Sequence, residues 1–239
     1  MGSPRGGDPP DPPPGPVPLG SLSRYRRADL ATPGGDQHTI ASFRQRSGWL
    51  GLASARLGAW TSLPRSGEAL VGARNIEPVL AVYAVDPAGQ LETIAASPEP
   101  ERLPGPALAM AAGDLGGDGF DELLLLRSGF NHRQLFVFRA EEGHRVLREA
   151  GRVELPGLAT WGPPGCRFTI LAARGRVEIY DCQGTLHRLT VKAEGSKLSL
   201  RLRDSLAGGP PAYWVLPWER GYLAYRVEDP ALQWVAWEP

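Results

Sequence analysis

Residues 113–126 read GDLGGDGFDELLLL, and this stretch is the most informative part of the chain for its fold. Asp114, Asp118 and Glu122 stand at the first, fifth and ninth places of a glycine-rich segment. Glycines let the backbone coil so that short carboxylates can turn inward together around a hard cation, which prefers oxygen ligands. The unbroken leucine run that follows is typical of a strand buried on both faces. The stretch therefore predicts a metal-type loop that leads directly into a buried strand.

The ligand set of this loop has one gap. Calcium takes about six to eight oxygen ligands. The backbone carbonyl of Phe120 is available at the seventh place, but the third place, where Asp or Asn is expected, is Gly116. Water or Asp121 would have to supply the missing oxygen. The alternative interpretation is a tight turn whose acidic side chains accept hydrogen bonds from backbone amides.

The stretch resembles the FG-GAP or VCBS-type repeat of integrin α-subunit propellers and of many bacterial surface proteins. The resemblance rests on the GD pair at 113–114, the GDG triplet at 117–119, and an aromatic residue followed by two acids and the leucine run. It implies a β-propeller in which this loop joins two strands of a blade. The implied ligands of a structural calcium ion are Asp114, Asp118, Phe120 and Glu122. With one ligand missing, the expected calcium affinity is weak, with a Kd of about 10⁻⁴–10⁻³ M.

Four segments with alternating apolar residues and an aromatic side chain recur along the chain. They are residues 80–86, 135–141, 177–182 and 222–228. Aligned on Val82, Val137, Ile179 and Ala224, they lie 55, 42 and 45 residues apart. A four-stranded propeller blade takes roughly 40–50 residues. The repeat predicts an all-β fold, a small β-propeller of four to five blades. The alternative is a β-sandwich of successive hairpins, which the same alternation would support.

Composition narrows the class of partner. The chain has 239 residues with 26 basic and 26 acidic side chains, so it has no net field that would attract nucleic acid or an anionic membrane. Hydrophobic residues make up 42% of the chain, which suits a soluble globular domain. Because no apolar run approaches about 18 residues, the sequence predicts no transmembrane segment. The expected partner is another protein or a surface ligand of unknown identity.

The amino-terminal region differs in composition from the rest. Residues 1–37 are rich in proline and glycine and are predicted to form a disordered tail or linker, whereas residues 38–239 are predicted to form the propeller-like domain. No signal peptide is visible at the start of the sequence. The resemblance nevertheless implies an extracytoplasmic location, periplasmic or secreted, and a cytoplasmic location stays open as the alternative.

Cysteine and tryptophan residues provide two further candidates. Cys166 and Cys182 flank a predicted hairpin, where facing strands can bring their Cβ atoms within disulfide reach. A bridge would indicate an oxidising compartment, and the alternative is two buried thiols in a reduced protein. Trp218, between Pro217 and Glu219 in a predicted turn, is the candidate for an exposed interaction residue.

The sequence contains no recognisable catalytic pattern. The four histidines are widely separated, and there is no nucleophile elbow, P-loop or zinc-type spacing. We therefore predict a non-enzymatic scaffold or protein-interaction module with one calcium loop. The alternatives are a carbohydrate-active propeller enzyme that works through paired carboxylates, and a subunit of a larger membrane-associated assembly.

Overall fold

The structure is a computed structural model. It describes residues 49–63, 67–74, 79–85, 91–98, 106–128, 133–159, 168–209, 211–218, 221–226 and 232–236. The predicted tail at 1–37 and the predicted boundary after it lie outside the described residues. All regular elements in the described part are strands, so the all-β prediction is confirmed. Among the described residues no helix is long and apolar enough to cross a membrane.

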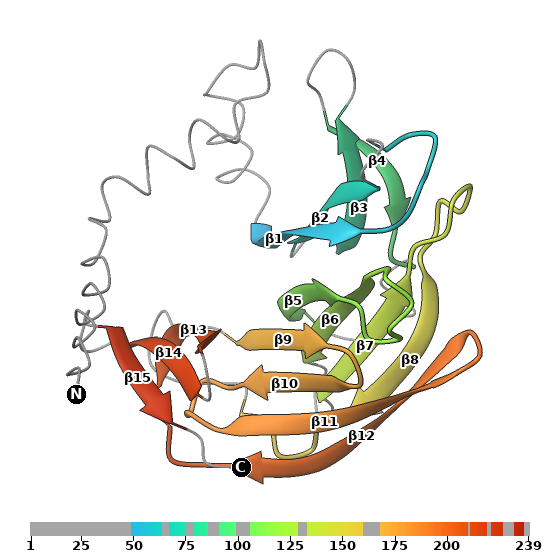
Figure 1. Cartoon of the computed structure of the whole chain (residues 1–239). Helices are drawn as coiled ribbons and strands as arrows, with labels where there is room; N and C mark the ends of the chain where they lie inside the picture. The colour runs from blue at the N-terminus through green and yellow to red at the C-terminus, as the bar shows by residue number, and fades with distance from the viewer. Residues whose placement is uncertain are drawn as a thin grey trace, which may run out of the picture. The chain divides into compact units, whose positions relative to one another are not determined.

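The strands form consecutive antiparallel sheets (Figure 1). Sheet A has the order β1-β2-β3-β4, and its strands are β1 (Trp49–Arg56), β2 (Glu68–Arg74), β3 (Leu80–Val85) and β4 (Leu91–Ala96). Sheet B has the order β5-β6-β7-β8, and its strands are β5 (Ala107–Gly113), β6 (Glu122–Ser128), β7 (Arg133–Arg139) and β8 (Arg148–Glu154). Each sheet is a meander in which every strand pairs with its neighbour in the chain.

The second half of the chain repeats this pattern. Sheet C contains β9 (Thr169–Ala173), β10 (Arg176–Tyr180), β11 (Leu186–Glu194) and β12 (Lys197–Leu206), paired in chain order. The described strands of the last sheet, sheet D, are β13 (Ala212–Trp218), β14 (Gly221–Arg226) and β15 (Leu232–Ala236). The predicted repeat corresponds to β3 and β7, which are third strands, and to β10 and β14, which are second strands. The sequence pattern thus marks middle strands and does not distinguish second from third.

Sheet B is packed on both faces, and β6 shows how. Leu123 and Leu125 belong to a core cluster shared with sheet A, whereas Leu124 and Leu126 belong to a second cluster shared with sheet C. All four leucines are fully buried. Successive side chains of a strand point to opposite faces, so an unbroken leucine run fills two cores at once. The prediction of a strand buried on both faces is confirmed.

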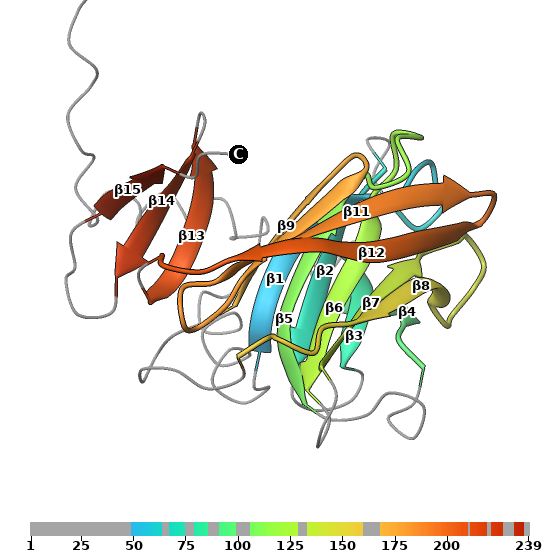
Figure 2. The same ribbon diagram turned by 90° about the horizontal axis from the view of Figure 1, so that it is seen from below.

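This packing distinguishes the two predicted architectures. A two-layer sandwich buries one face of each sheet, but sheet B has a different sheet on each face. The first strands of neighbouring sheets lie side by side, β1 beside β5 and β5 beside β9 (Figure 2). Successive four-stranded meanders that meet along their first strands are blades, and the fold is that of a small β-propeller.

Small residues permit the close approach of these first strands. A Cβ atom added to Gly113 at the end of β5 would lie 2.7 Å from the Cβ atom of Ala172 in β9 and 2.9 Å from the Ala172 carbonyl oxygen. Real Cβ atoms do not approach other atoms so closely, so any side chain here would force the two backbones apart.

Gly113→Ala should therefore lower the free energy of unfolding by about 1–3 kcal/mol, the usual cost of overpacking. Urea unfolding followed by circular dichroism measures the change. The matched control is Gly157→Ala, because an added Cβ atom there meets no atom within 4 Å. Equal unfolding midpoints for the two variants would contradict the close contact between β5 and β9.

Candidate functional site

The loop 114–121 joins β5 to β6, and a single carboxylate organises its backbone. Asp114 Oδ1 accepts hydrogen bonds from the amides of Gly117 at 2.6 Å and Asp118 at 3.1 Å, and its Oδ2 accepts one from Gly119 at 3.0 Å. Gly117 and Gly119 have φ values of 77° and 88°, which side chains rarely adopt. The glycines thus let three amides converge on one carboxylate, as in an Asx turn.

Glu122, the first residue of β6, joins the end of the loop to its beginning through hydrogen bonds. The residue is only 2% exposed. Its Oε2 accepts hydrogen bonds from the amides of Leu115 at 2.9 Å and Gly116 at 3.2 Å. Its Oε1 lies 2.8 Å from Nε and 2.7 Å from Nη2 of Arg139, at the end of β7. The buried charge of Glu122 is therefore both hydrogen-bonded and paired, as a buried carboxylate needs to be.

The predicted calcium ligands are brought into one loop, but their oxygens are already engaged. Both carboxylate oxygens of Asp114 accept hydrogen bonds from backbone amides. Glu122 accepts amides at Oε2 and the guanidinium of Arg139 at Oε1. Asp118 Oδ1 accepts the amide of Phe120 at 3.0 Å. Among the described residues, no group of three or more His, Cys, Asp or Glu side chains is arranged to hold a metal ion. Calcium binding stays a prediction, and in the observed arrangement donors of the protein itself occupy the carboxylate oxygens of Asp114 and Glu122.

The loop also connects sheet B to both of its neighbours. Asp121 exchanges two hydrogen bonds with Arg56 at the end of β1, since its Oδ2 accepts the Arg56 amide and its own amide donates to the Arg56 carbonyl, both at 2.7 Å. On the other side, the amide of Gly175 in the β9–β10 turn donates to the Leu115 carbonyl at 3.1 Å. The Arg174 side chain lies directly over Gly117. Three sheets are thereby tied together at one loop.

Phe120, the predicted carbonyl ligand, has a second property. Its residue is 49% exposed, and its ring lies against Gly58, where an added Cβ atom would meet Cε1 at 3.1 Å. Gly58 has a φ of 99°, so this position both needs glycine for its backbone and leaves room for the ring. One edge of the aromatic ring therefore lies against the connection between β1 and β2, and about half of the residue is exposed.

The other three predicted site residues, Cys166, Cys182 and Trp218, are described only in part. Cys182 is buried just after β10, but Cys166 is outside the described residues, so their bridge stays a prediction. Trp218 is the last residue of β13, and its Cα atom is paired with that of Gly221 across a hairpin. The residue belongs to a strand, whereas a turn was predicted for it, and its side chain is outside the described part, so its exposure stays a prediction.

The sequence analysis did not identify a chain of three polar side chains, Asp181, His187 and Ser205, of which the first two are buried. His187 on β11 is 2% exposed, and its Nε2 lies 3.1 Å from Asp181 Oδ2 while its Nδ1 lies 2.9 Å from Ser205 Oγ on β12. Because the Asp181 carboxylate only accepts, Nε2 donates to it, and Nδ1 lies within hydrogen-bond distance of the Ser205 hydroxyl. The register that places His187 opposite Ser205 was the information missing from the sequence.

Asp181 acts chiefly as an anchor for the β10–β11 turn. Besides His187, it accepts the amides of Gln183 and Thr185 at 2.9 Å and of Ala159 at 3.2 Å. Burial by itself raises the pKa of Asp181, but the hydrogen bonds from His187 and these amides outweigh it, so the pKa lies below its ordinary value. With all its partners inside the protein, this carboxylate fixes a turn.

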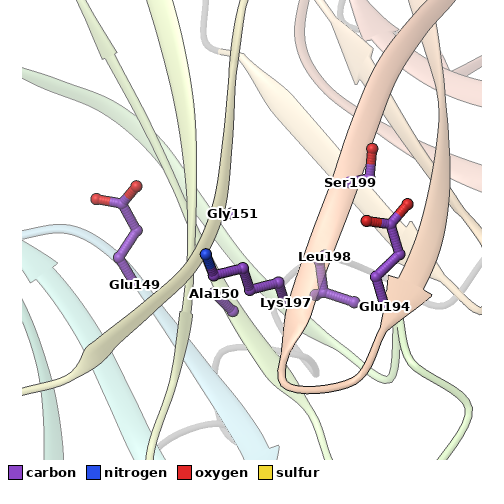
Figure 3. A pocket seen from close by; sticks show the side chains of 7 residues that line it. All are labelled: Glu149, Ala150, Gly151, Glu194, Lys197, Leu198 and Ser199. Carbon is purple, nitrogen blue, oxygen red and sulfur yellow. The ribbon is translucent and has the colours of Figure 1, made fainter.

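A shallow crevice of about 270 Å³ lies between β8 and β12, the outer strands of sheets B and C (Figure 3). Glu149 and Gly151 line it from β8, and Lys197 lines it from the start of β12. A Cβ atom on Gly151 would collide with the Leu198 carbonyl oxygen, so the two strands touch at this glycine. The crevice is smaller than typical ligand cavities, which begin at roughly 300 Å³, and it follows from this strand contact.

Comparisons with known proteins concern the fold alone. No model of a known protein family matches the sequence, and no curated protein matches it. The structure is similar to the WD40 domain of SCAP from fission yeast, with 10% identity and a TM-score of 0.47 over 81% of this chain. This chain spans only 42% of the length of that one. It is also similar to the AfRom2 CNH domain, with 9% identity and a TM-score of 0.34, covering 70% of this chain and 67% of that one.

The anchoring role of Asp181 predicts a pH dependence. A carboxyl group with a depressed folded pKa stabilises the fold above its unfolded pKa of about 3.9, and this stabilisation is lost as pH falls through the folded value. Asp181→Asn should lower the free energy of unfolding by about 2–4 kcal/mol at pH 7. The difference from the natural chain should shrink as pH falls below about 4.

Urea unfolding at pH 7, 5 and 3 measures this dependence. Asp204→Asn is the matched control, because Asp204 is also paired, to Arg188 at 2.6 Å, but lies on an outer strand. Its variant should lose less stability at pH 7. A difference between Asp181→Asn and the natural chain that does not change with pH would rule out the anchoring role of the ionised carboxylate.

Proposed function

We propose that the chain is a non-enzymatic scaffold that binds another protein through the surface formed by loop 114–121 and its immediate neighbours. The observation that carries this proposal is the half-exposed ring of Phe120 on a loop that is hydrogen-bonded to three sheets. We call this surface, comprising Phe120, Gly58, Arg56 and Arg174, the loop surface.

Rigidity supports a binding role for the loop surface. Six backbone amides between Leu115 and Phe120 donate to carboxylates of the same loop, and Asp121 fastens it to β1. A side chain held in place before binding loses little conformational entropy when a partner arrives. The loop therefore presents Phe120 in one orientation at low entropic cost.

The chemistry of the loop surface also suits a protein partner. Arg56 and Arg174 are exposed, and backbone hydrogen bonds fix the segments that carry them to the loop, at Asp121 for Arg56 and at Leu115 for the turn that contains Arg174. Aromatic and arginine side chains dominate the energetics of protein interfaces because they combine large apolar area with directed hydrogen bonds. A partner with an apolar pocket bordered by acidic side chains matches this combination.

Photo-crosslinking tests the proposal. A benzoylphenylalanine at position 120 should give a discrete cross-linked species in an extract of the source cells, because the ring faces the partner. Excess natural chain should compete it away, and Phe120→Ala should compete about 30-fold less well, the effect of losing an interface hot spot. The same photoreactive residue at Leu91, which is 38% exposed on β4, is the matched control.

The proposal fails if positions 120 and 91 give the same products, or if Phe120→Ala competes as well as the natural chain. Thermal unfolding of Phe120→Ala guards against a trivial explanation. Because the ring is half exposed, its loss should leave the melting temperature within a few degrees of the original.

An extracytoplasmic location is the second part of the proposal, and it depends on Cys166 and Cys182. A bridge would close a loop of about 15 residues and add roughly 3 kcal/mol to stability. Alkylation of the unfolded, unreduced chain should leave its mass unchanged if the bridge is present. Uptake of two alkyl groups would place the protein in a reducing compartment instead.

A further inference from the structure

The guanidinium of Arg139 occupies the part of the β5–β6 loop where the carboxylates converge. Its Nη2 lies 2.7 Å from Glu122 Oε1 and 3.7 Å from Asp118 Oδ2. Two of the four residues that the sequence resemblance assigns to calcium, Asp118 and Glu122, therefore face a cation of the protein itself. We infer that Arg139 takes the place of a metal ion in this loop, so that the order of the loop does not depend on calcium.

The strand register explains why Arg139 reaches this position. Phe138 is paired with Leu123 across β7 and β6, so the next residues outward, Arg139 and Glu122, lie together at the mouth of the loop. The Arg139 side chain is 21% exposed and the Glu122 side chain 3% exposed. Their contact is therefore shielded from solvent on the Glu122 side, where an ion pair is screened least.

Gly116 supplies an independent observation. A Cβ atom added at this residue would lie 3.1 Å from Arg139 Nη2, 3.6 Å from Glu122 Oε1 and 3.8 Å from Asp118 Oδ2. The third place of the loop, where a calcium ligand is expected, thus points at the guanidinium. The absence of an acid at Gly116 and the presence of Arg139 opposite it are therefore consistent with one replacement, in which the guanidinium takes the place of the metal ion.

The replacement also accounts for the number of oxygens. Calcium needs about six to eight oxygen ligands, whereas a guanidinium needs only acceptors for its few N–H groups. Glu122 and Asp118 provide such acceptors, and six backbone amides satisfy the remaining carboxylate oxygens named above. The guanidinium is covalently part of the chain, so chelators cannot remove it.

Thermal unfolding of the full chain, in calcium chloride and in EDTA, tests the inference. The two curves of the natural chain should coincide. Arg139→Gln should lower the melting temperature by about 4–8 °C, because it leaves the Glu122 carboxylate buried without its partner. The matched control is Arg148→Gln, which removes an exposed pair with Glu141 at 3.3 Å and should cost no more than about 1–2 °C.

A double variant tests whether calcium binds in the loop once the guanidinium of Arg139 has been removed. Gly116→Asp combined with Arg139→Gln restores the missing acid and removes the internal cation, so its melting temperature should be higher in calcium chloride than in EDTA. Gly116→Asp alone should show no such difference. A calcium-dependent melting temperature in the natural chain, a loss in Arg139→Gln no larger than in Arg148→Gln, or a double variant that ignores calcium would each overturn the inference.

Discussion

The two-sided burial of β6 is the constraint on which the rest of the structure depends. Its four leucines divide alternately between two cores, and the facing residues of β7 divide in the same way, since Phe136 and Phe138 join the first core and Leu135 and Val137 the second. Burying one such side chain stabilises a fold by about 1.5–3 kcal/mol. Because the same strand pair contributes to both cores, sheet A and sheet C are each positioned by sheet B, and the first strands of sheets B and C meet at small residues, Gly113 and Ala172.

The conformation of the loop before β6 depends on the burial of β6 on both faces. Glu122 is the residue at which the strand begins, and it is held between the Leu115 and Gly116 amides and Arg139 of the adjacent strand. The packing of β6 against β7 therefore fixes the relative position of the carboxylate and the guanidinium. The pairing of β6 with β7 therefore determines both the ion pair at the loop and the packing of the two cores.

Local patterns were predictable from the sequence, whereas cross-strand relations were not. The leucine run identified a strand buried on both faces, and the aromatic repeat identified middle strands. The strand β5 was missed because its sequence, ALAMAAG, is dominated by alanine, which has little strand propensity and is selected here by close approach to β9. Arg139 and Glu122 are separated by 17 residues, and His187 and Ser205 by 18. Only the strand register brings each of these pairs together.

The inferred replacement of a metal ion by Arg139 affects the binding role that we propose for the loop. A metal-dependent loop changes its order with the calcium concentration, so its affinity for a partner varies with its surroundings. A loop closed by Arg139 would present Phe120 in the same way at any calcium concentration, because its cation is covalently part of β7. Its hydrogen bonds to Arg56 and Gly175 then hold the aromatic ring in a fixed relation to three sheets. On this proposal the surface offered to a partner does not vary with calcium, and the ion pair between Arg139 and Glu122 is the structural reason.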